Sequence, residues 1–292
     1  MTFNMFSGNS FVGGRACALN SAAMQAGTAA TAVCFQLSSS FGGLLPADLD
    51  GATLPPTGSN EYFMNFGTNS VNLWKFHADF ANTNNSTFTG PTNLAVAAFS
   101  EACGGGSRVQ QLGTSERLDS LGDRLMYRLT YRNFGTHETM VASHSVAVGT
   151  SRKNPYTGVR WYEVRNPGGT PVIYQPSTFS PNTTFRWMSS IAMDKVGNIA
   201  LGYSASSSSI HPAVRYTGRL ATDPLNTMSI ENSIIAGTGS QTAGLNRWGD
   251  YSSMALDPVD DCTFWYANEY IASNGTFNWH TRMASFKFPS CQ

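Results

Sequence analysis

Residues 247–270 read RWGDYSSMALDPVDDCTFWYANEY, and residues 186–207 read RWMSSIAMDKVGNIALGYSASS. Each stretch opens on Arg-Trp, continues through Ser-Ser into an alternating apolar segment, reaches an Asp, and resumes the alternation after a short turn. Such alternation is typical of half-buried β-strands joined by tight turns. Repetition of the whole unit after about 60 residues is typical of propellers and related arrays.

More distant versions of this unit occur upstream. A third-strand pattern of Arg followed by alternating residues recurs at Arg15, Arg160, Arg215 and Arg282. The pattern predicts an all-β chain: a β-propeller of about five four-stranded antiparallel blades, forming a single domain over residues 1–292. A β-sandwich is the alternative, because it also has many short strands with frequent turns. A sandwich, however, does not need a repeat of the length of one blade.

The first and last blades are incomplete in this pattern. Residues 2–6, TFNMF, align with the second strands of other units, and the last unit stops after its third strand. Either the two terminal pieces complete one shared blade, or the chain is a fragment of a longer protein. Since an unpaired edge strand needs covering, we also expect self-association through the incomplete terminal blades.

Four stretches carry a resemblance to a known group. GNIALGYS, RYTGRL, RWGDYSSMALDPVDDCTFWY and FKFPSC resemble the C-terminal part of large, mostly uncharacterised secreted bacterial propeller proteins, loosely related to sialidase-like propellers. The resemblance covers nearly the whole chain. It implies a propeller fold, secretion and a start within a longer protein. It implies no particular activity, since propellers carry many unrelated functions.

The composition narrows the choice of partners. Charged residues are 12% of the chain and the formal net charge is zero, without a basic run. This charge pattern predicts neither a nucleic-acid partner nor a membrane partner. No apolar run approaches the roughly 20 residues of a membrane span, and residues 1–20 lack the layout of a signal peptide. We therefore expect a small-molecule or glycan substrate.

The five cysteines predict two disulfides. Cys262 opens the second strand of the last unit and Cys291 follows its third strand, so antiparallel pairing brings the two together. Cys17 and Cys34 lie on neighbouring strands of the first unit in the same way, which leaves Cys103 over. Disulfides indicate an oxidising compartment, so we expect a secreted or periplasmic protein. Free thiols in a cytosolic protein are the alternative.

The predicted site lies at one mouth of the central channel, where the starts of all first strands would converge. Charged and aromatic residues are frequent at those positions. Asp123 and Asp250 are the predicted metal ligands, for Ca²⁺ or another divalent cation, and no organic cofactor is expected. The channel-mouth residues are Asp119, Asp123, Arg124, Arg186, Trp187, Arg247, Trp248 and Asp250, with Glu138, His144, Glu269 and Tyr270 at nearby strand ends.

The leading hypothesis is an extracellular hydrolase, metal-assisted, acting on ester or phosphoester bonds of the phosphotriester kind. Arg124, Arg186 and Arg247 would stabilise developing negative charge. Metal-centred lactonase and phosphotriesterase propellers are similar in the general respect that a cation is bound at the channel mouth. No motif of this chain matches them residue by residue. His144 and Glu269 are the further catalytic candidates, and Trp187, Trp248 and Tyr270 the substrate-binding candidates.

Two other functions remain open. A glycosidase of sialidase-like type would grip a substrate carboxylate with the arginines and use Glu269 or Glu138 as acid or base. The S-x-D-x-G-x-x-W box of many sialidases is absent. A non-catalytic propeller that binds carbohydrates or surfaces would use exposed aromatic residues instead.

Each candidate also has a structural interpretation. Repeated Arg-Trp pairs stack and form ion pairs between blades in many repeat proteins. His144 is typical of a hydrogen-bonded interior histidine, and the DPVDD stretch is typical of a plain turn, because it lacks the alternating ligand spacing of a calcium loop.

Overall fold

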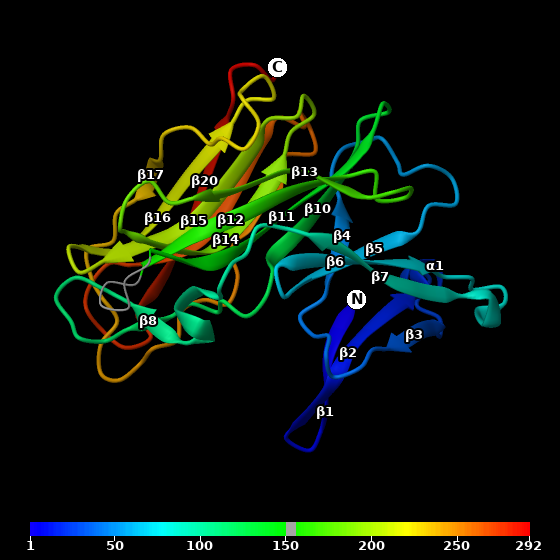
Figure 1. Cartoon of the computed structure of the whole chain (residues 1–292), viewed down its shortest axis with the longest axis horizontal. Coiled ribbons are helices and arrows are strands. Elements are labelled where there is room, and N and C mark those ends of the chain that lie inside the picture. The colour runs from blue at the N-terminus through cyan, green and yellow to red at the C-terminus, as the bar shows by residue number, and fades with distance from the viewer. Residues whose placement is uncertain (150–155) are drawn as a thin grey trace.

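The computed structural model describes residues 1–149 and 156–292 and shows an all-β protein. Strands hold 52% of the residues and helices 4%, so the predicted all-β class is confirmed. The strands form successive antiparallel meanders, in which each strand pairs with the next along the chain. We call these meanders modules one to five. Figure 1 shows module one near the N-terminus and the later modules following it across the molecule.

The strand bounds follow the predicted units closely. Module one contains β1 (Thr2–Ser7), β2 (Ser10–Leu19) and β3 (Ala32–Gln36), and module two contains β4 (Leu45–Leu49), β5 (Glu61–Gly67), β6 (Ser70–His77) and β7 (Thr87–Ala95). Module three contains β10 (Met126–Asn133), β11 (Glu138–Val148), β12 (Tyr156–Arg165) and β13 (Val172–Phe179). Module four contains β14 (Phe185–Met193), β15 (Ile199–Ser207), β16 (Ile210–Arg219) and β17 (Asn232–Ile235), and module five contains β18 (Ser253–Leu256), β19 (Thr263–Ile271) and β20 (Trp279–Lys287).

The remaining elements are short. They are α1 (Ser21–Gln25), the 3-10 helices η1 (Thr83–Asn85) and η2 (Ala102–Gly105), and the two-stranded ribbon of β8 (Ser107–Val109) and β9 (Leu118–Asp119). Modules one and five have three strands each, as the sequence predicts.

Modules two and three are joined into one strongly curled eight-stranded sheet. Their first strands, β4 and β10, run parallel, with Leu129 opposite Ala47 and Tyr131 opposite Leu49. The sequence did not predict this connection. Strand β4 is short and contains a proline and an aspartate, so it lacks the apolar alternation by which the other strands were recognised.

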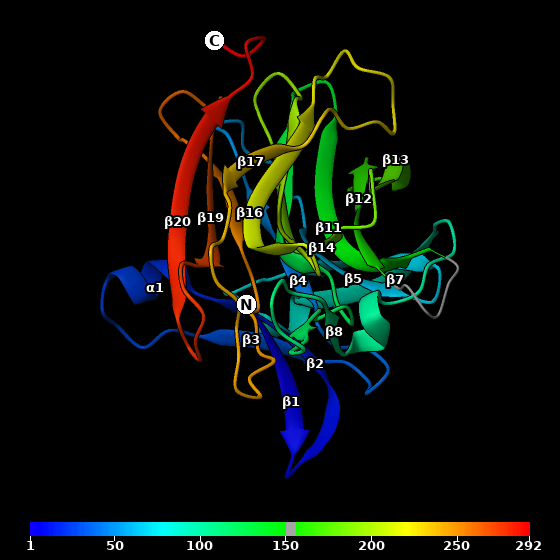
Figure 2. The same cartoon turned by 90° about the vertical axis from the view of Figure 1, so that its left-hand side faces the viewer.

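The core lies in layers between successive modules. Each of four apolar clusters is shared by two consecutive modules, from modules one and two to modules four and five. Residues on either face of one strand therefore serve different layers, since successive side chains point to opposite faces. Trp161 packs toward module four and the adjacent Tyr162 toward module two. Figure 2 shows β20, β19 and β16 side by side in this stacked arrangement.

The Ser-Ser of each repeated stretch lies at a junction between modules. Ser190 accepts a hydrogen bond of 2.9 Å from the backbone N–H of Met254, and Ser252 donates one of 3.0 Å to the backbone carbonyl of Met188. Ser189 donates to Ser143 of module three at 2.9 Å. Because buried backbone groups need partners, Ser190 and Ser252 stabilise the junction between modules four and five.

Both predicted disulfides are present. Cys17 bonds to Cys34 and Cys262 to Cys291, while Cys103 is a buried free thiol. Two disulfides indicate an oxidising extracellular or periplasmic environment. In the described part of the chain, no helix has the length and hydropathy to cross a membrane.

Removing the second disulfide should destabilise the protein. The Cys262–Cys291 bond closes a loop with a sequence separation of 29. On the chain-entropy account, we expect the double variant Cys262→Ala/Cys291→Ala to lose about 3.5 kcal/mol of unfolding free energy. Urea denaturation without reductant measures this loss. A loss below about 1 kcal/mol would mean that the unfolded state is already restricted without the bond.

Acid should destabilise the protein through His144. This side chain is fully buried, its Nε2 lies 2.9 Å from the Tyr162 hydroxyl, and burial lowers its pKa to about 3. Because the unfolded histidine titrates near 6.5, stability is present above that pH and is lost as the pH falls toward 3. We expect a loss of up to about 1.4 kcal/mol per pH unit in that range.

The variant His144→Phe should show a shallower pH dependence of unfolding free energy between pH 6.5 and 4. His77 is exposed, and His77→Gln is the matched control. Equal slopes for His144→Phe and the original protein would contradict a neutral buried histidine.

Candidate functional site

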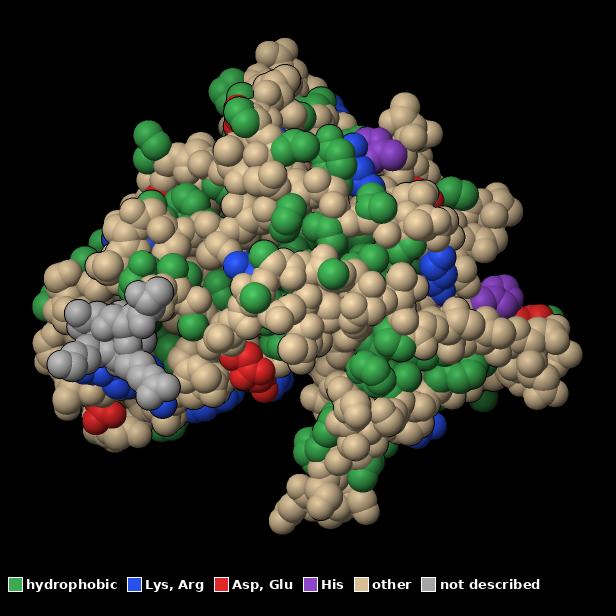
Figure 3. Space-filling view, viewed as in Figure 1, with side chains coloured by type: hydrophobic (Ala, Val, Ile, Leu, Met, Phe, Trp, Pro, Cys, Tyr) green, Lys and Arg blue, Asp and Glu red, His purple; other side chains and the backbone are tan. Residues whose placement is uncertain are grey.

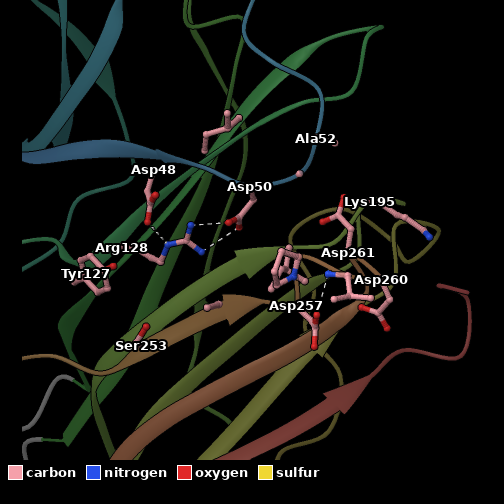
Figure 4. A pocket seen from close by; sticks show the side chains of 16 residues that line it. Asp48, Asp50, Ala52, Tyr127, Arg128, Lys195, Ser253, Asp257, Asp260 and Asp261 are labelled. Carbon is pink, nitrogen blue, oxygen red and sulfur yellow. Dashed lines mark hydrogen bonds and ion pairs between the residues drawn. The ribbon is translucent and has the colours of Figure 1, made fainter. Parts of the chain in front are cut away.

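An acidic groove lies where first strands from three modules meet. Its volume is about 750 Å³. Module two contributes the end of β4 and the following loop, module three contributes β10, and module five contributes β18 and the turn after it, while module four adds Lys195 from the turn after β14. Figure 4 shows their side chains around one hollow, with Asp48 and Tyr127 at one end and Asp257 and Asp260 at the other. Volumes of this size suit a small-molecule ligand.

Two aspartates and one arginine form the wall on the side of module two. Arg128 donates from Nε to Asp48 at 2.8 Å, and from Nη1 and Nη2 to Asp50 at 3.1 and 2.6 Å. The side chains of Arg128 and Asp50 are 6% and 9% exposed, whereas that of Asp48 is 49% exposed. Burial raises the pKa of Asp50 against the opposing effect of Arg128. The arginine thus holds one buried and one accessible carboxylate.

An irregularity in β10 directs two consecutive side chains into the groove. On a regular strand, Tyr127 and Arg128 would point to opposite faces. The pairing of β10 with β11 shifts register between Met126 and Thr130, and both Tyr127 and Arg128 line the groove. Such irregularities commonly redirect side chains beside functional sites.

The opposite wall is the turn after β18. Asp257 accepts hydrogen bonds from the Val259 N–H at 2.9 Å and from the Trp265 indole at 3.1 Å. Asp260 accepts from the Thr263 N–H at 2.8 Å and from its hydroxyl at 2.7 Å, and these bonds hold the pKa of Asp260 well below its usual range.

This wall is tied to module three by an ion pair. The Arg132 guanidinium forms a bidentate ion pair with Asp261 and donates from Nε to the Met193 carbonyl at 3.0 Å. The DPVDD stretch is therefore a turn, as predicted, and it also forms a surface of the groove.

The predicted metal ligands are each paired with an arginine. Asp123 receives two hydrogen bonds from Arg124, at 2.9 and 3.0 Å, which hold its pKa below the usual value. Asp250 is paired with Arg247, which also lies 3.5 Å from Asp119. Within residues 1–149 and 156–292, no group of three or more His, Cys, Asp or Glu residues could hold a metal ion. Metal binding by these aspartates stays a prediction.

The other predicted arginine and both tryptophans are buried. Arg186 has a fully buried side chain and bonds from Nε to Glu231 of its own module at 2.9 Å. Trp187 and Trp248 are 0% and 2% exposed, with ring centroids 5.8 Å apart. The indoles thus pack module four against module five, as the structural interpretation predicts, whereas Arg186 forms its ion pair within its own module and not with a neighbouring one. The three arginines bind different carboxylates and do not converge on one point.

The remaining candidates lie apart from the groove lining. Glu269 accepts a hydrogen bond of 2.5 Å from the Gly249 N–H, and burial raises its pKa. Tyr270 packs beside His280, with ring centroids 5.6 Å apart. Glu138 accepts a bond of 2.6 Å from the Tyr131 hydroxyl. His144 is enclosed by aromatic rings, as expected of an interior histidine.

The groove residues were missed in the sequence for two reasons. Asp48 lies in β4 and Asp50 directly follows it, and this strand lacks an apolar alternation, although the D-x-D spacing in PADLDG is visible in the sequence. Arg128 and Arg132 stand at equivalent alternate positions of MYRLTYRN, where two buried arginines would need carboxylate partners. The need for carboxylate partners was the available signal. It does not identify the partners, which are about 80 and 130 positions away in the sequence.

Comparison with known proteins adds no relative. No protein-family model matches the chain, and a search of curated proteins finds no match.

The two aspartates bound to Arg128 should differ sharply in their effect on stability. Asp50→Asn leaves a buried guanidinium without its bidentate partner, so we expect a loss of about 3 kcal/mol of unfolding free energy. Asp48→Asn removes a half-exposed partner and should cost at most about 1 kcal/mol. Urea denaturation at pH 7 measures both values. Equal losses in the two variants would contradict the assignment of Asp50 as structural and Asp48 as accessible.

Proposed function

We propose that this chain is a secreted β-propeller protein that binds glycans lacking acidic groups in the acidic groove. The observation that carries the proposal is a row of carboxylates, each fixed by donors of the protein, around a hollow large enough for a sugar. Fixed acceptors of this kind suit the hydroxyl or amino groups of a glycan, because each carboxylate oxygen can accept more than one hydrogen bond.

The arrangement of the modules supports the propeller. The groove is lined by the first strands β4, β10 and β18, and each module continues from its first strand in sequence order. Successive modules share core layers, and the first strands β10, β14 and β18 contact one another. In radially repeated sheets, first strands surround a central channel, and the groove would be the mouth of that channel.

The charge of the groove supports the class of ligand. Five aspartates line it with two basic residues, Arg128 and Lys195, and Arg132 and Lys287 pair with Asp261 and Asp260 from outside the lining, which leaves an excess of one negative charge. Like charges repel strongly where solvent is partly excluded. Sialylated or sulfated glycans and phosphomonoesters are therefore disfavoured, whereas neutral sugars and amino sugars are accommodated. Asp48 is the best-placed acceptor, because no described residue donates to its Oδ1.

Hydrolysis is a second candidate, favoured by the unequal environments of Asp48 and Asp50. Pairs of carboxylates with separated pKa values provide the acid and base of many glycosidases. Burial raises the pKa of Asp50, and Asp48 is accessible. Neutral esters and phosphotriesters would also enter the groove, with or without a divalent cation.

Binding should depend on glycan charge and on Asp48. We expect neutral and amino-sugar oligosaccharides to bind in isothermal titration calorimetry at pH 7, and sialylated ones at least tenfold more weakly. Asp48→Asn should weaken binding about tenfold or more, since it removes a charged hydrogen-bond acceptor.

Glu116→Gln is the matched control, because the Glu116 carboxylate accepts no hydrogen bond from a described residue and lies outside the groove lining. Preference for sialylated glycans, or undiminished binding by Asp48→Asn, would overturn the proposal. Turnover of chromogenic glycosides or phosphotriesters that is lost in Asp48→Asn would establish the second candidate.

A further inference from the structure

A second cavity adjoins the acidic groove and shares Tyr127 with it. Its volume is about 320 Å³, and it is lined by residues of β1, the loop before β4, and the starts of β10 and β18. Both volumes fall within the range of roughly 300–1,000 Å³ that small-molecule sites occupy. The Tyr127 ring, 41% exposed, therefore stands between two hollows. In Figure 4 it lies at the Asp48 end of the groove.

The second cavity has different chemistry from the first. Its lining contains three partly exposed aromatic residues, Phe3, Tyr127 and Tyr251, which are 46%, 41% and 47% exposed. Arg124 is its charged residue, and Asp123 holds the guanidinium in place by two hydrogen bonds. No carboxylate of a described residue lines it. The apolar C–H face of a sugar ring packs favourably on such aromatic surfaces.

We infer that the two cavities are consecutive subsites for one linear glycan, with Tyr127 at the junction. This inference rests on the proposed glycan binding. A neutral or amino sugar unit occupies the acidic groove and hydrogen-bonds its carboxylates, and the next units pack on Tyr127, Tyr251 and Phe3. The substrate class is therefore an oligosaccharide or polysaccharide rather than a monosaccharide.

The local backbone supports this division of roles. The register shift of β10 brings Tyr127 and Arg128 to one side, so a single dipeptide supplies the aromatic junction and the arginine that organises Asp48 and Asp50. Tyr251 lies just before β18, and Phe3 lies in β1. The aromatic residues thus come from modules one, three and five, and this subsite exists only in the assembled chain.

The length dependence of binding tests the inference. We expect affinity to rise at least tenfold from the monosaccharide to the trisaccharide in a ladder of cello-oligosaccharides or de-N-acetylated chito-oligosaccharides, measured by calorimetry at pH 7. In Tyr251→Ala the trisaccharide should lose most of this gain, whereas Tyr251→Phe should keep it. Tyr174, 38% exposed and outside both cavities, provides the matched control Tyr174→Ala.

The outcomes separate the two proposals. Equal affinity for the monosaccharide and the trisaccharide would overturn the second subsite and leave the acidic groove as a single-sugar site. Absence of binding for every member of both ladders would overturn the proposed function and this inference together. Thermal unfolding of each variant shows whether it is folded. If Tyr251→Ala is not folded, Tyr251→Phe is the variant to compare, because it retains the aromatic ring.

Discussion

The structure depends on polar side chains that satisfy the backbone where first strands of different modules meet. Strands β14 and β18 are edge strands of their sheets, yet β14 is fully buried and β18 is partly buried, so part of their buried backbone has no ladder partner. Side-chain hydroxyl groups and arginines form hydrogen bonds to these backbone groups instead. Thr130 donates to the Ile191 carbonyl at 3.0 Å, and Arg132 donates to the Met193 carbonyl at the same distance. Without such partners, each unsatisfied buried backbone group would cost about 1–3 kcal/mol.

The repeated sequence stretch predicted the first strands and their neighbours well. The need to satisfy buried backbone groups recurs in each module, and the sequence pattern recurs with it. Alternating apolar residues located the strands of modules three to five, and strand order located both disulfides. The parallel pairing of β4 with β10 could not be predicted, since it joins two short segments about 80 residues apart that carry no shared pattern. Pairing between distant segments depends on tertiary packing rather than on local periodicity.

The acidic groove could not be predicted from the sequence, and none of the predicted catalytic, metal-ligating or substrate-binding residues lines it. Positions at the starts of first strands are indeed rich in charge, but sequence cannot tell whether a charged side chain faces a hollow or a neighbour. Arg186 is a buried structural residue because it pairs with Glu231, which is 45 positions away in the sequence. Asp48 became accessible because Arg128 is shared with the more deeply buried Asp50. Burial and pairing over long distances decide these roles, and neither leaves a local signature.

The layered core has a consequence for how the chain comes apart. When each layer belongs to two neighbouring modules, stability behaves as a sum of contacts between nearest neighbours, as in linear arrays. Modules two to four have neighbours on both sides, whereas module one shares one apolar cluster with module two, and module five shares its clusters with modules on one side only. The two covalent cross-links lie in these two modules. Local unfolding would therefore begin in modules one and five. The two disulfides stabilise the modules that are held from one side only.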